Sequence, residues 1–389
     1  MSLLFEKGNI GSLILKNRIV KSATLENMAN SDGLPTDDTL NFYESLASGG
    51  SGLIITGYAY VNKNGKSFLF QNGCHNDDII PEWQRIIDVV HKNGAKIAME
   101  IVHGGRQINS RLFKRKPMAA SRFPNFFYFS ISLSMTEKEI EQTIEDFGKA
   151  ASRAKKAGFD AVQIHAAHGY LIANFLSPLT NRRSDKWGKD RFLFLEKVYM
   201  AIREAVGKNF PILCKLNVDD FVGFGITERC SFLYAKRLEE LELDGLEISG
   251  GILETTFNMS MGEIPVDIMC RNRGMLEKIY LTTFLNIQKL WTGFKEAYFL
   301  EYAKRLKPSL KIPLILVGGI RKKKTAETIL ENKHSDFVSM ARALICEPDL
   351  PKKWEENTQD SARCLSCNLC IGEVEQGNKT KCYKFWQNN

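Results

Sequence analysis

The stretch TEKEIEQTIEDFGKAASRAKKAGFDAVQIH, residues 136–165, contains the unit from which the fold is predicted. Its first and fourth residues, Thr136 and Glu139, form a capping-box pattern that predicts the start of a helix. Gly158 is expected to end this helix, because glycine readily adopts the left-handed backbone that follows many helices. The apolar run Ala161–His165 lacks strict alternation, which is typical of a strand buried on both faces. The stretch therefore predicts a helix followed by an interior strand.

This alternation of helix and strand extends along the chain. The predicted helices are Glu137–Ala157, Arg191–Val206, Glu228–Leu241 and Thr325–Asn332. Short runs rich in Ile, Val and Leu predict eight strands, at Arg18–Ser22, Gly52–Thr56, Lys96–Ile101, Ala161–His165, Ile212–Asn217, Gly245–Ser249, Pro313–Val317 and Phe337–Met340. Eight strands alternating with helices predict an α/β fold, a (β/α)8 TIM barrel. The alternative is a doubly wound open sheet, but the chain lacks the G-x-G-x-x-G turn typical of the dinucleotide-binding version.

Two segments are expected to be loop insertions on the barrel, Arg106–Ser134 with its dense aromatic run and the Met-rich Gly251–Leu285. Both would leave the carboxyl ends of strands, the face on which TIM barrels carry their active sites. The cysteine-rich C-terminal end is expected to be an extension. The predicted division is a barrel domain at 1–358 and a C-terminal extension at 359–389.

Composition narrows the class of protein. The 389 residues are 44% hydrophobic, and 53 Lys and Arg against 45 Asp and Glu give a net charge of +8. No run approaches the about 18 apolar residues of a membrane span, and no secretion signal is recognised. The basic clusters at 114–116 and 321–324 read best as solvated loops and helix starts. We therefore expect a soluble cytoplasmic protein that binds neither nucleic acid nor membrane.

The end of the fourth predicted strand carries the strongest candidates for catalysis. His165, His168 and Tyr170 would enter the barrel mouth together. Imidazole N–H groups can hold a carbonyl oxygen, and a phenol can transfer a proton. The two histidines could instead be structural or bind a metal, although no acidic partner or third histidine is evident nearby.

Other strand ends point to a phosphorylated cofactor. Lys215 lies inside a strand expected to be buried, so its ammonium should face an anion or an electron-rich ligand. Gly318 and Gly319 follow the seventh strand, and Ala341 and Arg342 follow the eighth. Barrels often bind phosphate at this position, and glycine lets the backbone approach it closely.

An ordered set of segments resembles the old yellow enzyme family of FMN-dependent NADH:flavin oxidoreductases, many of them ene-reductases. The resemblance spans residues 3 to about 356 and rests on LKNRIVKSAT (15–24), VHGGRQ (102–107), HAAHGY (165–170), KLN (215–217), VGG (317–319) and AR (341–342). It implies that the barrel holds FMN non-covalently. The implied cofactor-binding residues are Ala23, Thr24, Gly57, Tyr58, Glu100, His165, Lys215, Gly318, Gly319, Ala341 and Arg342.

The resemblance also implies a ping-pong reaction. NAD(P)H would reduce the flavin and leave, and an activated alkene such as an enone would then enter the same site. His165 and His168 would hold the carbonyl oxygen of the alkene, and Tyr170 would protonate its α carbon. The implied partners are the nicotinamide nucleotide and a small alkene, with a homo-oligomer as a further expectation.

Three departures from the family pattern affect the expected flavin site. Lys215 stands where many relatives have arginine, and Glu100 stands where a glutamine is usual. Glu100 is therefore expected either to pair with Lys215 or to carry a proton. Leu25 stands where relatives often place a Thr or Cys near the flavin, so that contact is expected to be missing.

The tail contains Cys364, Cys367, Cys370 and Cys382. Three cysteines two residues apart suit a [4Fe–4S] cluster better than zinc, and free or oxidised thiols are the third alternative. The loop resembles the cluster-binding loop of 2,4-dienoyl-CoA reductase and trimethylamine dehydrogenase. With a cluster, an external electron donor could replace NADH, which makes an FMN/iron–sulfur electron-transfer protein the alternative function. A barrel without redox chemistry, binding a small ligand or using a metal for hydrolysis, is a third interpretation.

Overall fold

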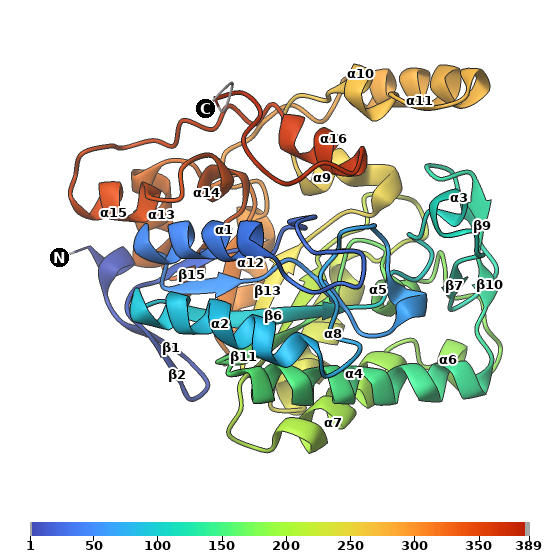
Figure 1. The fold of residues 1–389 in the computed structure, drawn as a ribbon, viewed down its shortest axis with the longest axis horizontal. Helices are drawn as coiled ribbons and strands as arrows, with labels where there is room; N and C mark the ends of the chain where they lie inside the picture. Colours follow the sequence, from blue (N-terminus) through green and yellow to red (C-terminus); the bar gives the residue numbers. More distant parts are fainter. Residues whose placement is uncertain (1, 386–389) are drawn as a thin grey trace.

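The computed structural model describes residues 2–385, and its centre is a closed barrel of eight parallel strands (Figure 1). Every neighbouring pair is parallel, and the last strand pairs with the first. The predicted TIM barrel is confirmed, and the open sheet is wrong. The strands in barrel order are β3 (Ile19–Lys21), β4 (Leu53–Ile55), β6 (Lys96–Val102), β11 (Ala161–Ala166), β12 (Ile212–Asn217), β13 (Gly245–Ser249), β14 (Leu314–Val317) and β15 (Phe337–Met340).

The strand bounds predicted from the sequence agree with the structure, and every predicted strand end lies within one residue of the observed one. Helix α4 (Glu137–Ala157) has the predicted bounds, with Thr136 and Glu139 capping each other and Gly158 at φ +96°. The other long helices around the barrel are α1 (Asp37–Ser48), α2 (Ile79–Lys92), α7 (Leu193–Val206), α8 (Glu228–Glu240) and α13 (Lys323–Glu331). No helix in residues 2–385 is both long and apolar enough to cross a membrane.

The amino end of the barrel is filled by apolar side chains. The hairpin of β1 (Gly8–Ile10) and β2 (Leu13–Leu15) closes this end. Its buried residues pack in one cluster with barrel residues that include Val20, Leu53, Ala98, Ala161, Leu213, Ile315 and Phe337. The barrel is thus a packed core at its floor, and only its other end is available for a ligand.

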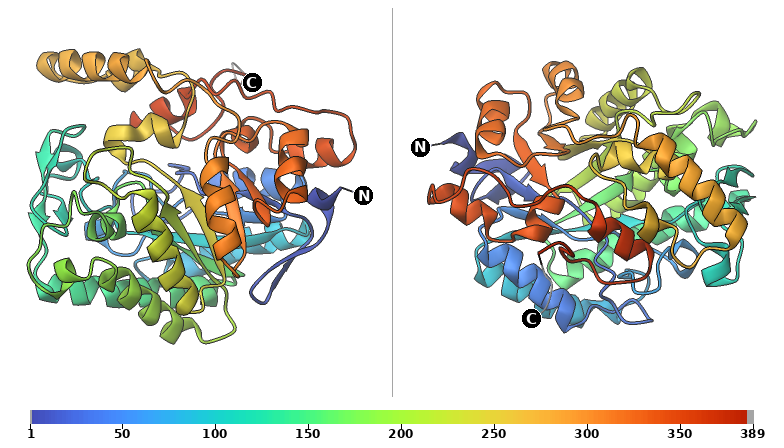
Figure 2. Two further views of the ribbon diagram at one scale, coloured as in Figure 1. Left: turned by 180° about the vertical axis from the view of Figure 1, so that it is seen from behind. Right: turned by 90° about the horizontal axis from the view of Figure 1, so that it is seen from above.

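Three segments gather over the carboxyl end of the barrel (Figures 1 and 2). The first, residues 103–134 after β6, contains α3 (Ser110–Phe113) and the short strands β7 (Met118–Ala119), β8 (Pro124–Asn125), β9 (Ser130–Ile131) and β10 (Leu133–Ser134). The second, after β13, contains α9 (Thr256–Met259), α10 (Val266–Met269) and α11 (Met275–Gln288). The third is the C-terminal extension with α16 (Leu369–Glu375), which packs against α10. The domain boundary at 358 stays a prediction, and residues 386–389 lie outside the described chain.

Truncation of the barrel floor should destabilise the fold. Leu15 is fully buried in the floor, so Leu15→Ala leaves a cavity and should lower the free energy of unfolding by about 2–5 kcal/mol in urea titrations. Ile14 on the same strand is 61% exposed, and Ile14→Ala should change it by less than about 0.5 kcal/mol. Equal losses for the two variants would contradict this role of the hairpin.

Candidate active site

A cavity of about 1410 Å³, including its open mouth, occupies the carboxyl end of the barrel. All eight strands, or the loops directly after them, contribute to its wall: in barrel order Ser22, Tyr58, Glu100, His165, Lys215, Ser249, Gly318 and Ala341. The predicted residues Ala23, Thr24, His168, Tyr170, Gly319 and Arg342 line it as well. The structure therefore brings together, in one place, nearly all the residues predicted for catalysis and cofactor binding.

Gly57 is the exception, and its contact with the cofactor stays a prediction. It does not line the cavity, and its N–H donates to Glu26 Oε1 at 2.6 Å and to Tyr43 Oη at 3.0 Å. A Cβ at this position would lie 2.0 Å from Glu26 Oε2. Glycine is therefore required here by close packing against a buried carboxylate.

A buried ion pair lies at the base of the cavity. Lys215 Nζ is 2.9 Å from Glu100 Oε2 and 3.4 Å from Glu247 Oε2. The Gln163 amide donates to the same two carboxylate oxygens, at 2.6 and 3.0 Å. Burial alone would lower the pKa of Lys215, but the two carboxylates outweigh burial and raise it. The expected pairing of Glu100 with Lys215 is present, and the ammonium keeps its charge.

Sequence analysis missed Glu247 and Gln163. Glu247 Oε1 also accepts hydrogen bonds from Ser22 at 2.7 Å and from Ser339 at 2.8 Å, so it joins strands on opposite sides of the barrel. The available signal was a charged or amide residue inside an otherwise apolar strand, the same signal that singled out Lys215.

The two histidines are neutral hydrogen-bonding groups. His165 Nδ1 accepts the Ala167 N–H at 3.3 Å, which leaves Nε2 to carry the ring proton. His168 Nε2 lies 2.7 Å from Ser249 Oγ. Burial, together with the charge of Lys215, holds the pKa of His165 well below its usual range. Burial, His165 and Lys215 do the same to the pKa of His168.

The turn that presents His168 is held by side chains from two other segments. His168 has φ +58°, a left-handed conformation that is uncommon outside glycine. Its N–H donates to Asn217 Oδ1 at 3.0 Å, and its carbonyl accepts from the Gln107 amide. These contacts offset the backbone strain and fix the histidine against the cavity. Asn217 and Gln107 lie in segments that carried the family resemblance, but they had no assigned role.

Tyr170 faces the cavity beside the histidines. Its hydroxyl donates to Tyr58 Oη at 2.8 Å, and its ring centroid is 4.8 Å from that of His165. Burial raises the pKa of both Tyr170 and Tyr58 above the ordinary value. Both phenols therefore keep their protons, and Tyr170 is available as a proton donor.

The cavity fits a flavin phosphate at one end and a pyrimidine ring at the other. Gly318 and Gly319 have φ of +122° and +71°, and a Cβ on Gly319 would lie 2.6 Å from Lys295 O. Glycine is therefore required here by its backbone conformation and by close packing, and these two glycines line the cavity together with Arg342. At the base, Glu100 Oε1 is buried and accepts no hydrogen bond from the described residues. A flavin N3–H would supply the missing donor, so the residues present fit FMN.

The four tail cysteines line a second, smaller cavity of about 320 Å³. Arg342 lines this cavity as well as the large one. Burial raises the pKa of Cys370 to about 12, whereas a hydrogen bond from the Cys346 thiol lowers that of Cys382 to about 6. Within residues 2–385, no three His, Cys, Asp or Glu side chains are arranged to hold one metal ion.

Comparison with known proteins identifies the class. The family model described as NADH:flavin oxidoreductase / NADH oxidase matches residues 3–361, and the chain belongs to this family of flavin-dependent oxidoreductases. It is 36% identical to an NADH oxidase of Thermoanaerobacter brockii, over 97% of this chain and 55% of that protein. It is 32% identical to a 4,4'-dithiodibutanoate disulfide reductase of Rhodococcus erythropolis, over 97% of this chain and 94% of that protein.

A solved structure extends the likeness to the tail. A 2-naphthoyl-CoA reductase in complex with 2-naphthoyl-CoA superposes with a TM-score of 0.86 and 25% identity, over 98% of this chain and 56% of that one. The chain thus spans about half the length of this reductase and of the NADH oxidase. Structures of morphinone reductase share the fold, with a TM-score of 0.72 and 23% identity.

Replacing Glu100 should change the redox potential of bound FMN. Glu100→Gln removes a buried negative charge from the base of the cavity, so the anionic reduced flavin becomes easier to form. The midpoint potential should rise by about 30 mV or more, equivalent to about 1.4 kcal/mol for two electrons. Dye-equilibration titrations would measure it, with Glu373→Gln, which does not line the cavity, as the control. An unchanged potential in Glu100→Gln would contradict this assignment.

Proposed function

We propose that the protein is an FMN-dependent NAD(P)H oxidoreductase that reduces activated C=C bonds, of the enone or enoate type, by a ping-pong reaction. The observation that carries the proposal is the group of His165, His168 and Tyr170 on one wall of the cavity. It contains two neutral imidazoles that can donate hydrogen bonds and a phenol that keeps its proton.

The remaining lining residues support a site for FMN. Glu100 and Lys215 would face its pyrimidine ring, while Gly318, Gly319 and Arg342 would hold its phosphate. The residues Ala23, Thr24, Tyr58, His165 and Ala341 complete the contacts expected for cofactor binding. When bound, FMN would supply the redox chemistry, taking a hydride from NAD(P)H and giving it to the alkene.

The chain's own residues orient the alkene and deliver its proton. His165 and His168 donate hydrogen bonds to the carbonyl oxygen, which draws electron density from the double bond and favours attack at the β carbon. Tyr170 Oη gives its proton to the α carbon. Tyr58, hydrogen-bonded to Tyr170, is placed to return a proton to the phenolate. Because the same groups hold one carbonyl at a time, nicotinamide and alkene occupy the cavity in turn.

Replacing Tyr170 tests this reaction directly. Tyr170→Phe removes the proton donor, so oxidation of the reduced enzyme by 2-cyclohexen-1-one should slow by about 10²–10⁴-fold in stopped-flow measurements. Reduction by NADPH should change by only a few-fold, because it needs no proton from this phenol. Tyr199→Phe, on helix α7, is the control. A lack of enone turnover by the wild type, or equal slowing of both half-reactions, would overturn the proposal.

A second function is favoured by the tail. The four cysteines share one cavity wall with Arg342, which also lines the large cavity. Four cysteine thiolates, three of them two residues apart in the sequence, suit a [4Fe–4S] cluster. A cluster here would let an external redox partner exchange electrons with FMN.

Metal analysis tests this second function. Protein purified without oxygen should contain about four irons and four sulfides per chain, with broad absorption beneath the flavin bands. Cys367→Ser should remove most of the iron, whereas Cys230→Ser, on helix α8, should not. Iron-free protein, or equal iron in the two variants, would eliminate the cluster.

A further inference from the structure

The C-terminal extension completes the wall of the active-site cavity. The family match ends at residue 361, yet the cavity is also lined by Cys364, Ser366, Cys370, Ile371, Val374, Glu375 and Thr380. Glu375 is the acidic side chain of this group, and the proposed reaction gives it no role. The family match therefore does not explain why a carboxylate lies in this part of the cavity wall.

Glu375 is paired with a tyrosine from the first insertion. Tyr128 Oη donates to Glu375 Oε2 at 3.1 Å, and both residues line the cavity. Burial raises the pKa of Glu375 above its usual value, although the Tyr128 hydrogen bond and the charge of Arg273 act against this rise. The Tyr128 proton is already directed at one carboxylate oxygen, so the remaining lone pairs of Glu375 are available to a ligand.

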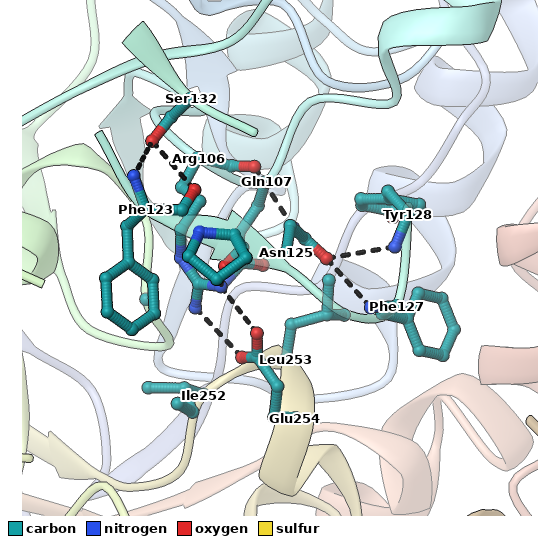
Figure 3. A network of polar contacts seen from close by, with 12 residues as sticks. Arg106, Gln107, Phe123, Asn125, Phe127, Tyr128, Ser132, Ile252, Leu253 and Glu254 are labelled. Atoms are coloured by element: carbon teal, nitrogen blue, oxygen red, sulfur yellow. Dashed lines mark hydrogen bonds and ion pairs between the residues drawn. The ribbon is translucent and has the colours of Figure 1, made fainter. Parts of the chain in front are cut away.

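A network of polar contacts holds the wall that carries Tyr128 (Figure 3). Asn125 Oδ1 accepts the N–H groups of Phe127 at 3.0 Å and of Tyr128 at 2.9 Å. The Asn125 amide in turn donates to Arg106 O at 3.1 Å. The buried Arg106 guanidinium donates hydrogen bonds to both carboxylate oxygens of Glu254. This ion pair joins the first insertion to the second. The backbone that carries Tyr128 is therefore held by side chains of both insertions.

Apolar side chains line the same cavity as this pair. Leu25, Phe68 and Leu253 are three of them, and all three are buried. Glu375 should bind a ligand that donates a hydrogen bond to it more tightly than an isostere of the same shape that cannot. The isostere would displace water from the carboxylate without replacing the lost hydrogen bond.

We propose that Tyr128 and Glu375 form a recognition site in which Glu375 accepts a hydrogen bond from a hydroxyl or amino group of the substrate. The site binds the part of the alkene remote from the carbonyl held by His165 and His168. This inference rests on the proposed alkene reduction and adds to it a preference between substrates. Glu375 and Tyr128 are specificity-determining residues and take no part in hydride or proton transfer.

Matched substrates test the inference. Ring-hydroxylated 2-cyclohexen-1-ones and their methoxy analogues differ in the ability to donate a hydrogen bond. The FMN-loaded wild type should prefer the hydroxyl compound by about tenfold in kcat/KM, mainly through KM. Glu375→Gln keeps one acceptor and should retain part of this preference, and Glu375→Leu should lose it. The matched control is Glu373→Leu on the same helix, since Glu373 pairs with Arg271 and does not line the cavity.

The outcomes separate this inference from the function on which it rests. Turnover of both enones with equal effects of Glu375→Leu on each would overturn the inference and leave alkene reduction intact. A lack of turnover of any enone by the wild type would overturn both. Tyr128→Phe provides a second test of the recognition site, because it keeps the ring and removes the hydroxyl that orients Glu375. It should reduce the preference for the hydroxyl compound without slowing reduction by NADPH.

Discussion

The ammonium of Lys215, enclosed in the barrel, imposes a constraint on the strands around it. An unpaired charge at this depth would be strongly destabilising, so the strands must bring carboxylates to it. Lys215 is in register with Glu247 on the neighbouring strand, and Gln163 is in register with Glu100 on the other side. These four side chains form one polar layer inside the barrel, and a slip of one residue in any strand would turn that strand's member to the outer face. The polar layer and the strand register therefore depend on each other.

The same layer sets the protonation states above it. The charge of Lys215, added to burial, keeps His165 and His168 neutral, as required for imidazoles that donate to a carbonyl rather than carry a proton. Burial keeps Tyr170 protonated. Below the layer, the apolar floor of the barrel excludes water. Lys215 thus stays charged between two carboxylates, while the histidines above it stay neutral and Tyr170 keeps its proton.

The sequence predicts the parts of this arrangement that have local causes. Strands and caps were placed closely because each depends on a few neighbouring residues, as at Thr136 and Gly158. Glu247 and the Tyr128–Glu375 pair were missed, because the residues that they contact lie on distant segments and no sequence spacing predicts such contacts. The packing of Gly57 against Glu26 was missed for the same reason, since the carboxylate lies 31 residues away. The cysteine spacing indicated a shared site, and the four cysteines do line one cavity.

The residues proposed for catalysis and those proposed for substrate recognition lie on different parts of the chain. The groups proposed for flavin binding and proton transfer sit on or directly after barrel strands, where backbone pairing holds them. Tyr128 and Glu375 sit on an insertion and on the extension, which can change without disturbing the strands. The backbone at Tyr128 is nevertheless held by Asn125 and by the Arg106–Glu254 ion pair, and the Tyr128 hydroxyl reaches Glu375 from there. A wall built on loops in this way lets one barrel keep its reaction while its substrate preference changes.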